Sequence, residues 1–319
     1  MLKTLLAAAL AVALSPLAVM AAEWTYTDGG GRTVTLPDVP KRIVAHANVA
    51  AGLIPLGIRP VGIYVDGPVK DDPSLRGLDL TGIEILGEAW GEIDIEKLAA
   101  AKPDIILAEY WPLEKAYSGL EPGGGSDASL VEQIAPVVGP VQGNSTEALI
   151  KDYEALATLL GANLDDPAIA ADKAKFEHSK AAFQAAVAAK PGLTVLAVWA
   201  GTDALYVASA DGSAELSDFK KWGLDIIVPE TADDRGYWET VSWENADKYQ
   251  PDLVLVDDRA GAATRQTAEA QPTWKSIKAA AAGQVGDWPA FWMRNYRVYA
   301  EQLDKLTATI NATNENLTP

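Results

Sequence analysis

Short apolar runs alternate with amphipathic segments along most of the chain. Apolar runs bounded by turn residues are typical of buried parallel strands, and the intervening 3.6-residue periodicity indicates helices that cover both faces of a sheet. The pattern predicts two groups of strands on either side of a helical stretch. The first group covers residues 43–45, 61–65, 105–108 and 137–141; the second covers 194–199, 205–208, 226–228, 253–257 and 285–288.

The helical stretch is rich in Ala, Lys, Glu and Leu and is interrupted only near residues 161–167. Asp166 is a favoured N-cap residue and Pro167 suits the first helical position, so a helix of about 24 residues, about 36 Å long, is predicted after this break. The fold class is therefore α/β, with two doubly wound α/β lobes joined by a single long α-helix. The predicted domains are an N-terminal α/β lobe at 23–145, a helical linker at 146–190 and a C-terminal α/β lobe at 191–319.

The first 22 residues have the features of a secretory signal peptide. Lys3 supplies the positive start, residues 5–14 form an apolar segment too short to span a bilayer, and Val19-Met20-Ala21 is a small-residue cleavage site. No cysteine is available there for a lipid anchor, so we expect a protein free in a bacterial periplasm. Beyond the signal peptide no stretch reaches 18 consecutive apolar residues, and none is expected to span a membrane.

Composition excludes several classes of function. The chain has 319 residues with 26 Lys and Arg against 44 Asp and Glu, a formal net charge of −18, which disfavours nucleic acid as a partner. It has no cysteine for a nucleophile, zinc site or iron–sulfur cluster, and its two histidines cannot form a three-His metal site. No nucleophile elbow or phosphate loop is present, but a carboxylate pair has no spacing rule, so a periplasmic hydrolase remains an alternative.

A short unit occurs once in each predicted lobe. Glu96 and Glu244 each precede a Pro-Asp turn by the same number of residues, and an apolar strand follows each turn. Asp94 and Ser242 are the corresponding N-cap candidates, so each copy predicts a helix of about two turns, a turn and a buried strand.

Aromatic side chains are concentrated where the predicted strands end. Because ligands of open α/β sheets bind at the carboxyl ends of the strands, these residues predict an aromatic-lined cleft between the lobes. For any one tryptophan, core packing is an equally good interpretation. His46, at a strand end, is either an axial haem ligand or a hydrogen-bonded core residue. The candidate ligand-binding residues are Trp90, Tyr110, Trp111, Trp199, Arg235, Tyr237, Trp238, Arg259 and Trp292.

Several segments resemble the periplasmic binding proteins of ABC importers for iron–siderophores, haem and cobalamin, the class III substrate-binding proteins. They are Lys41-Arg42-Ile43-Val44, the segment 56–62, the paired Glu and Pro-Asp units, and the ending 271–277 followed by Gly283-Gln284-Val285. The resemblance covers essentially the whole mature chain. Ferric-hydroxamate binders are the most similar, since Tyr110, Tyr237-Trp238 and the segment 289–292 match positions of ligand-contacting aromatics. Trp90 stands where that subgroup has an arginine.

The resemblance implies capture of an Fe(III)–siderophore and delivery to an inner-membrane ABC permease, with no catalysis. Glu96 and Glu244 match the glutamates that pair with arginines of the two permease subunits. No cofactor is implied: Fe(III) enters only within the siderophore, so the protein supplies no metal ligand. We also expect a monomer. A tricatecholate chelate carries about three negative charges, whereas the strand ends of the first lobe offer no Arg or Lys and those of the second mainly Arg235 and Arg259, so a hydroxamate chelate fits better. Haem or cobalamin binding is the alternative within the family.

Overall fold

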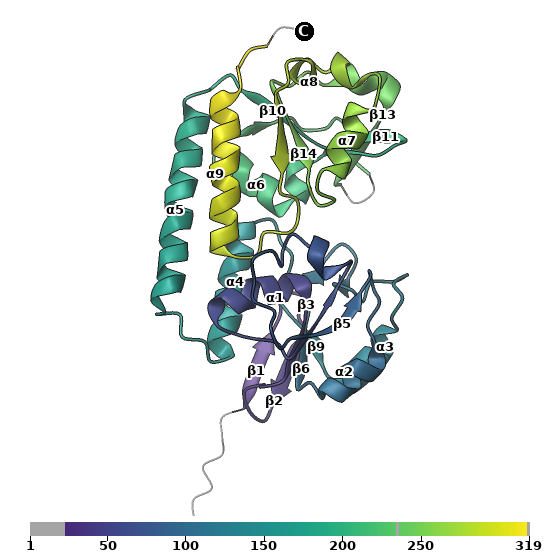
Figure 1. Ribbon diagram of the computed structural model, residues 1–319, viewed down its shortest axis with the longest axis vertical. Helices are drawn as coiled ribbons and strands as arrows, with labels where there is room; N and C mark the ends of the chain where they lie inside the picture. The colour runs from purple at the N-terminus through teal and green to yellow at the C-terminus, as the bar shows by residue number, and fades with distance from the viewer. Residues whose placement is uncertain (1–22, 234–235, 318–319) are drawn as a thin grey trace, which may run out of the picture.

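The computed structural model describes residues 23–233 and 236–317 and has two α/β lobes stacked along its long axis (Figure 1). The N-lobe contains the strands β1 to β9 and the helix α4, and the C-lobe contains β10 to β15 and α9. The predicted fold class is confirmed. The predicted signal peptide, residues 1–22, lies outside the described residues, as does Arg235.

The N-lobe is built on a parallel sheet of strand order β5-β4-β3-β6-β9. The strands β3, β4 and β6 lie close to their predicted positions, whereas β9 ends early because Pro140 has no N–H to donate to a ladder. Two antiparallel pairs, β1–β2 and β7–β8, were not predicted, nor was β5. The elements are β1 Trp24–Thr27, β2 Thr33–Leu36, β3 Ile43–His46, α1 Ala47–Leu53, η1 Ile54–Leu56, β4 Gly62–Val65, η2 Val69–Asp71, β5 Glu84–Glu88, α2 Ile95–Ala101, β6 Ile105–Leu107, β7 Tyr110–Trp111, β8 Ala116–Tyr117, α3 Ala128–Ile134 and β9 Val137–Val138.

The C-lobe sheet has the order β13-β11-β10-β14-β15, with β12 also paired to β10. It is mixed, because β11 runs antiparallel to both β10 and β13, while β14 and β15 are parallel to β10. The strand β13 was not predicted. The elements are β10 Thr194–Ala200, β11 Ala204–Ala208, η3 Ala210–Gly212, α6 Ala214–Lys221, β12 Asp225–Ile226, β13 Trp238–Ser242, η4 Trp243–Lys248, β14 Leu253–Asp257, α7 Ala263–Glu269, η5 Trp274–Ser276, α8 Lys278–Ala281 and β15 Val285–Trp288.

Long helices form the flank that connects the two lobes (Figure 1). The helix α5, Pro167–Ala188, carries the chain from one lobe to the other, and Asp166 caps it by accepting a hydrogen bond from the backbone N–H of Ala168. The helix α9, Tyr296–Ala312, lies beside α5, so the connecting flank contains a second long helix that was not predicted. The helix α4, Thr146–Leu159, contributes Leu149, Tyr153 and Leu156 to the N-lobe core and Ile150 to the C-lobe core.

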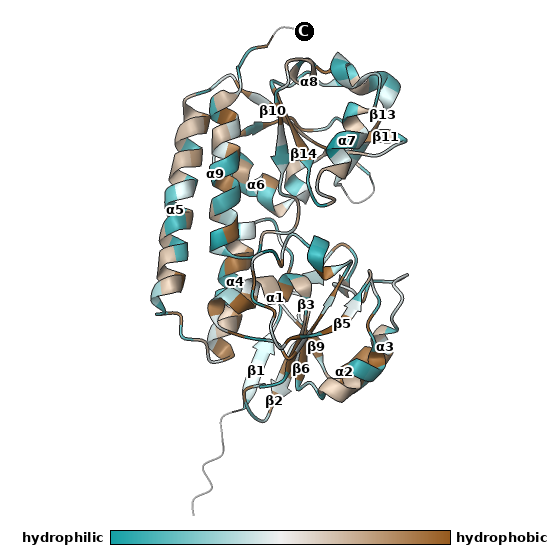
Figure 2. Ribbon diagram, in the orientation of Figure 1, coloured by the Kyte–Doolittle hydropathy of each residue, from teal (hydrophilic) through white to brown (hydrophobic). Residues whose placement is uncertain are grey.

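Each lobe has its own hydrophobic core, with apolar residues concentrated on the strands and on the helix faces that cover them (Figure 2). In the N-lobe core, Tyr153 and Leu156 of α4 pack with residues of β3, β4 and β6. In the C-lobe core, Phe176 and Phe183 of α5 pack with Tyr299 of α9. Within the described part of the chain no helix is both long enough and apolar enough to cross a membrane.

The repeated unit adopts different structures in its two copies. In the first, Asp94 caps α2 by accepting a hydrogen bond from the N–H of Lys97 at 3.0 Å, as predicted. In the second, a helix forms at the predicted place, but it is the 3₁₀ helix η4, and Asn245 within it has non-helical dihedral angles. The Ser242 hydroxyl accepts its bond from the side-chain amide of Asn245 at 3.0 Å instead of from a backbone N–H, so the α-helical cap does not form.

Candidate functional site

The carboxyl ends of the parallel strands in the two lobes border a cleft of about 620 Å³. Strands β3, β4 and β6 end at its N-lobe wall, and β14 and β15 end at its C-lobe wall. This is where ligands of open α/β sheets bind, and the volume is typical of small-molecule sites. The N-lobe wall includes Asn48, Asp66, Asp72, Trp90, Trp111, Glu114, Ser118, Glu121 and Gln142; the C-lobe wall includes Arg259, Ala290, Phe291 and Trp292.

The structure places four of the nine predicted ligand-binding residues in this lining: Trp90, Trp111, Arg259 and Trp292. Tyr110 does not line it. Successive side chains of a strand point to opposite faces, so when Trp111 of β7 faces the cleft, Tyr110 faces away from it. The Tyr110 ring packs on that of Tyr117, with a centroid separation of 5.3 Å.

The remaining predicted aromatics lie in or beyond the C-lobe wall. Tyr237 packs edge-to-face on Phe291 at 5.5 Å, and Trp238 packs behind it against Trp288 at 6.0 Å. Both therefore support the wall, rather than line the cleft. Trp199 is 37% exposed and packs on Tyr206 at 4.9 Å, outside the cleft lining.

Arg259 holds its position on the C-lobe wall through an ion pair with Asp257. Its Nη2 lies 2.6 Å from Oδ2 of Asp257, and its guanidinium stacks over the Phe291 ring at 4.8 Å. Burial lowers the pKa of Arg259, but the charge and hydrogen bonds of Asp257, together with Tyr237 and Glu215, raise it by more, so the net shift is upward. The cleft thus receives a cation whose charge is largely balanced by its own neighbour.

Phe291, from the segment 289–292 that the resemblance matched to ligand-contacting aromatics, also lines the cleft. Its φ is +64°, a left-handed conformation that is strained for a bulky residue. Its backbone N–H donates to the buried carboxylate of Glu215 at 3.1 Å, and the Trp288 indole N–H donates to the same oxygen at 2.9 Å. Burial raises the pKa of Glu215. These contacts fix the Phe291 ring at the cleft surface, and nothing in the local sequence signals the strain.

Trp292 is oriented by Asp258. The indole N–H donates to Oδ1 of Asp258 at 2.7 Å, which leaves the ring available to the cleft. Burial raises the pKa of Asp258 to about 6. The charges of Asp287 and Asp257 also raise this pKa, and the hydrogen bond from Trp292 lowers it.

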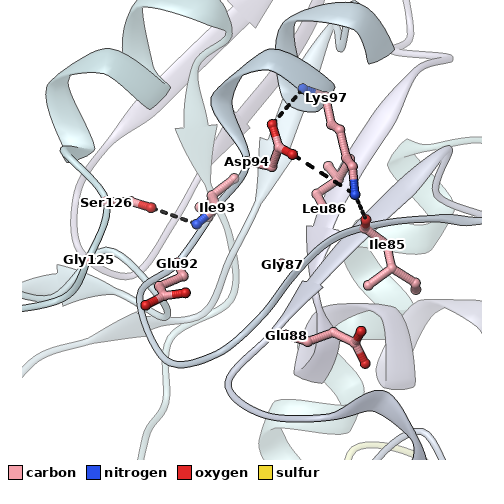
Figure 3. Close-up of a pocket in the computed structure, with 10 residues that line it drawn as sticks. All are labelled: Ile85, Leu86, Gly87, Glu88, Glu92, Ile93, Asp94, Lys97, Gly125 and Ser126. Carbon is pink, nitrogen blue, oxygen red and sulfur yellow. Dashed lines mark hydrogen bonds and ion pairs between the residues drawn. The ribbon is translucent and has the colours of Figure 1, made fainter.

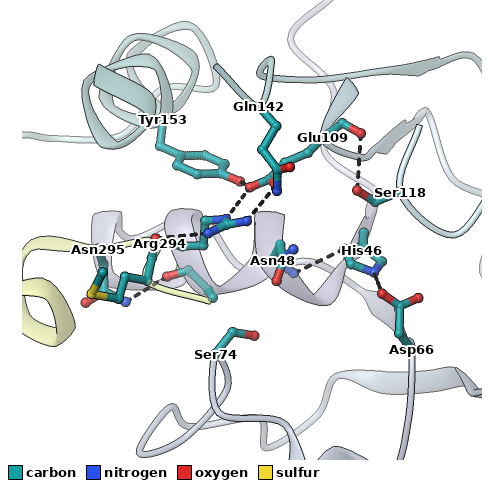
Figure 4. A network of polar contacts seen from close by, with 12 residues as sticks. His46, Asn48, Asp66, Ser74, Glu109, Ser118, Gln142, Tyr153, Arg294 and Asn295 are labelled. Carbon is teal, nitrogen blue, oxygen red and sulfur yellow. Dashed lines mark hydrogen bonds and ion pairs between the residues drawn. The ribbon is translucent and has the colours of Figure 1, made fainter. Parts of the chain in front are cut away.

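His46 is a hydrogen-bonded core residue, 2% exposed (Figure 4). Its Nε2 lies 3.1 Å from the carboxylate of Asp66, and its Nδ1 accepts from the N–H of Asn48 at 3.3 Å. Burial lowers its pKa, but the hydrogen bond and charge of Asp66, together with the charges of Glu109 and Asp72, raise it by more. Because both ring nitrogens are engaged, neither is available to haem iron. The described residues also contain no cluster of three metal-ligating side chains.

A buried ion pair joins the two lobes beside the cleft (Figure 4). Arg294, which precedes α9 and is 3% exposed, donates from Nε and Nη2 to the two carboxylate oxygens of Glu109, at 2.5 and 3.0 Å. Glu109 follows β6, is 0% exposed, and also accepts hydrogen bonds from Gln142 and Tyr153. This contact anchors the segment before α9 to the N-lobe and thereby fixes the position of one cleft wall relative to the other.

A second cavity, of about 530 Å³, lies between the end of β5 and the start of α2 (Figure 3). It belongs to the N-lobe alone and has no aromatic lining. Its polar groups bond to one another: Lys97 donates to the carbonyl of Ile85 at 3.3 Å, and the N–H of Ile93 donates to Ser126 at 2.7 Å. The interlobe cleft, with aromatic walls from both lobes, is therefore the better candidate site.

Comparison with known proteins places the chain in a family. The family model described as periplasmic binding protein matches residues 79–290. DesE, a ferric-siderophore receptor protein from Streptomyces coelicolor, shares 31% sequence identity with this chain, and its structure matches with a TM-score of 0.81. The match covers 92% of this chain and 99% of the DesE chain. FhuD2 from Staphylococcus aureus, with bound ferrioxamine B, has 20% identity and a TM-score of 0.59, over 85% of this chain and 98% of the FhuD2 chain. This similarity shows the same fold.

Siderophore binding proteins recur among the similar structures. One, from the fuscachelin gene cluster of Thermobifida fusca, has 23% identity, a TM-score of 0.62, and coverages of 85% and 96%. A comparison with curated proteins found no significant match. The family match and the similarity to DesE together show that the chain belongs to the periplasmic binding proteins, in the class III group that includes ferric-siderophore binding proteins.

Proposed function

We propose that this protein captures a ferric siderophore of the hydroxamate type in the interlobe cleft and delivers it to an ABC importer in the inner membrane. The observation that carries the proposal is the cleft itself, whose aromatic residues come from both lobes and whose basic residue, Arg259, is already paired with Asp257. DesE is described as a ferric-siderophore receptor and FhuD2 holds ferrioxamine B, which supports the same ligand class for this chain.

Charge separates the hydroxamates from other chelates. Three hydroxamates neutralise Fe(III), whereas three catecholates leave about three negative charges that a protein must compensate with several cations or strong donors. The described cleft lining offers Arg259 and several carboxylates, and Asp257 balances the charge of Arg259. Aromatic rings pack well against the apolar spacers of a neutral chelate.

Calorimetric titration with ferrioxamine B tests this function. We expect one site per chain with a Kd at or below the micromolar range, equivalent to about −8 kcal/mol or stronger. Trp292→Ala removes an aromatic ring from the cleft and should weaken binding by about 2 kcal/mol, roughly 30-fold. Trp199→Ala is the matched control, because this tryptophan lies outside the cleft lining, and it should bind as the wild type does. Failure of the wild type to bind ferrioxamine B or other ferric hydroxamates would refute the proposal.

Delivery is tested separately by the exposed glutamates in the first turns of α2 and η4. Glu96 and Glu244 lie outside the cleft lining, so Glu96→Ala with Glu244→Ala should leave ferrioxamine affinity unchanged and severely reduce uptake into cells. A melting temperature only slightly below the wild-type value is expected, because a carboxylate at a helix start contributes about 0.3 to 1 kcal/mol.

The matched control for delivery carries the same change of charge elsewhere on the surface. Glu177→Ala with Glu301→Ala alters exposed residues of α5 and α9, on the connecting flank, and should transport normally. If the Glu96 and Glu244 double variant also transports normally at equal protein levels, these glutamates have no role in docking.

A further inference from the structure

The two walls of the interlobe cleft differ in charge. The N-lobe wall carries the carboxylates of Asp66, Asp72 and Glu121, and among the described residues of the lining Arg259 alone is basic. An ordinary exposed surface mixes both signs, whereas here one sign lines one side of a concave site. Fields of one sign are concentrated in such clefts because their walls have a low dielectric constant.

Arg259 does not balance these carboxylates. Its Nε lies 3.1 and 2.9 Å from the two carboxylate oxygens of Asp257, and its Nη2 completes a bidentate pair. A bidentate guanidinium–carboxylate pair uses the strongest donors of the side chain, so little of the positive charge is left for the opposite wall. The cleft therefore has an excess of negative charge on its N-lobe side.

The carboxylates of this wall differ in how well they are satisfied. Asp66 accepts from His46, and Asp72 accepts from the N–H and hydroxyl of Ser74 at 2.8 and 2.6 Å. Oε2 of Glu121 is shielded from solvent and has no hydrogen-bond partner among the described residues. Burial raises the pKa of Glu121, and the charge of Asp66 raises it further. A shielded carboxylate oxygen without a donor is costly unless a ligand supplies one.

From this arrangement, and resting on the proposed function, we infer that the ligand carries a protonated primary amine, which binds the N-lobe wall at Glu121 beside Asp66. A ferric trihydroxamate is neutral at its metal centre, so an ammonium on its chain gives the whole ligand one positive charge. The aromatic rings of Phe291 and Trp292 then contact the apolar spacers, while the ammonium donates to the carboxylates opposite. Chelates with net negative charge, such as tricatecholates, meet like charge on this wall.

The test compares two ligands that differ at the amine alone. Ferrioxamine B ends in a protonated amine, and its N-acetyl derivative has the same chelate without the charge. Wild-type protein should bind ferrioxamine B about tenfold more tightly than the acetylated ligand, as expected for loss of a charge-assisted hydrogen bond. Raising the salt concentration should weaken ferrioxamine B binding more than binding of the acetylated ligand.

A variant locates the amine. Glu121→Gln should weaken ferrioxamine B by a similar factor and leave the acetylated ligand unchanged, so the two perturbations should not add. Glu92→Gln is the matched control, because Glu92 lines the separate N-lobe cavity, and it should change neither affinity. Equal wild-type affinity for both ligands would overturn this inference while leaving the proposed function intact. Binding of neither ligand would overturn both.

Discussion

Replacing Arg294 by methionine should reveal how strongly the buried ion pair holds the lobes together. Glu109 would keep its hydrogen bonds from Gln142 and Tyr153 but lose both bonds from the guanidinium, and its charge would remain in a site that is 0% exposed. Removing one partner of a buried pair costs about 3 to 5 kcal/mol. At about 2 to 4 °C per kcal/mol for a chain of this size, the melting temperature should fall by about 6 to 20 °C.

The double variant Glu109→Gln with Arg294→Met separates the pair from its surroundings. Glutamine can still accept from Tyr153, and no buried charge remains, so a large part of the loss should be recovered. Urea unfolding followed by circular dichroism gives the four free energies of the double-mutant cycle. The reasoning is refuted if Arg294→Met costs less than about 1 kcal/mol, or if the two single substitutions simply add.

Two further predictions concern the C-lobe wall. Phe291→Gly should be more stable than Phe291→Ala by about 1 kcal/mol, because glycine adopts a φ of +64° without strain, and thermal unfolding of the two variants measures the difference; alanine equal to or better than glycine would mean that the backbone is not strained there. For Asp258, whose folded pKa is about 6, protonation is favoured by folding, so its contribution is fully present below the unfolded pKa and is lost as the pH rises through about 6. Asp258→Asn should therefore gain stability relative to wild type at pH 8 but not at pH 4, measured by urea unfolding, and an equal difference at both pH values would contradict this.

Most of the strands that the sequence predicted are buried on both faces, where apolar residues run without interruption; β15, which contains an exposed Asp287, is an exception. The missed strand β5, Glu84–Glu88, has charged residues at both ends, and β7 and β8 are two residues each, so their pairing depends on the surrounding fold. The Ser242 cap did not form, because the Ser242 hydroxyl bonds to the side chain of Asn245 instead of a backbone N–H, and the helix there is 3₁₀.

The position of the cleft was predictable because the carboxyl-end rule depends on topology alone. The residues that line the cleft were harder to predict than its position. Which face of β7 meets the ligand decides between Tyr110 and Trp111, and the sequence of such a short strand has no periodicity that would settle it. The contact between Glu109 and Arg294 joins residues 185 positions apart, and Phe291 bonds to Glu215, which lies 76 positions away, so neither has a local signal.

Locating the iron atom tests the central claim most directly. Crystals of the protein with bound ferrioxamine B should give one strong anomalous peak at the iron absorption edge, inside the interlobe cleft between Trp292 and the N-lobe wall near Glu121. An iron peak in the N-lobe cavity beside α2, or no ordered iron despite saturating chelate, would contradict the assignment of the cleft as the ligand site.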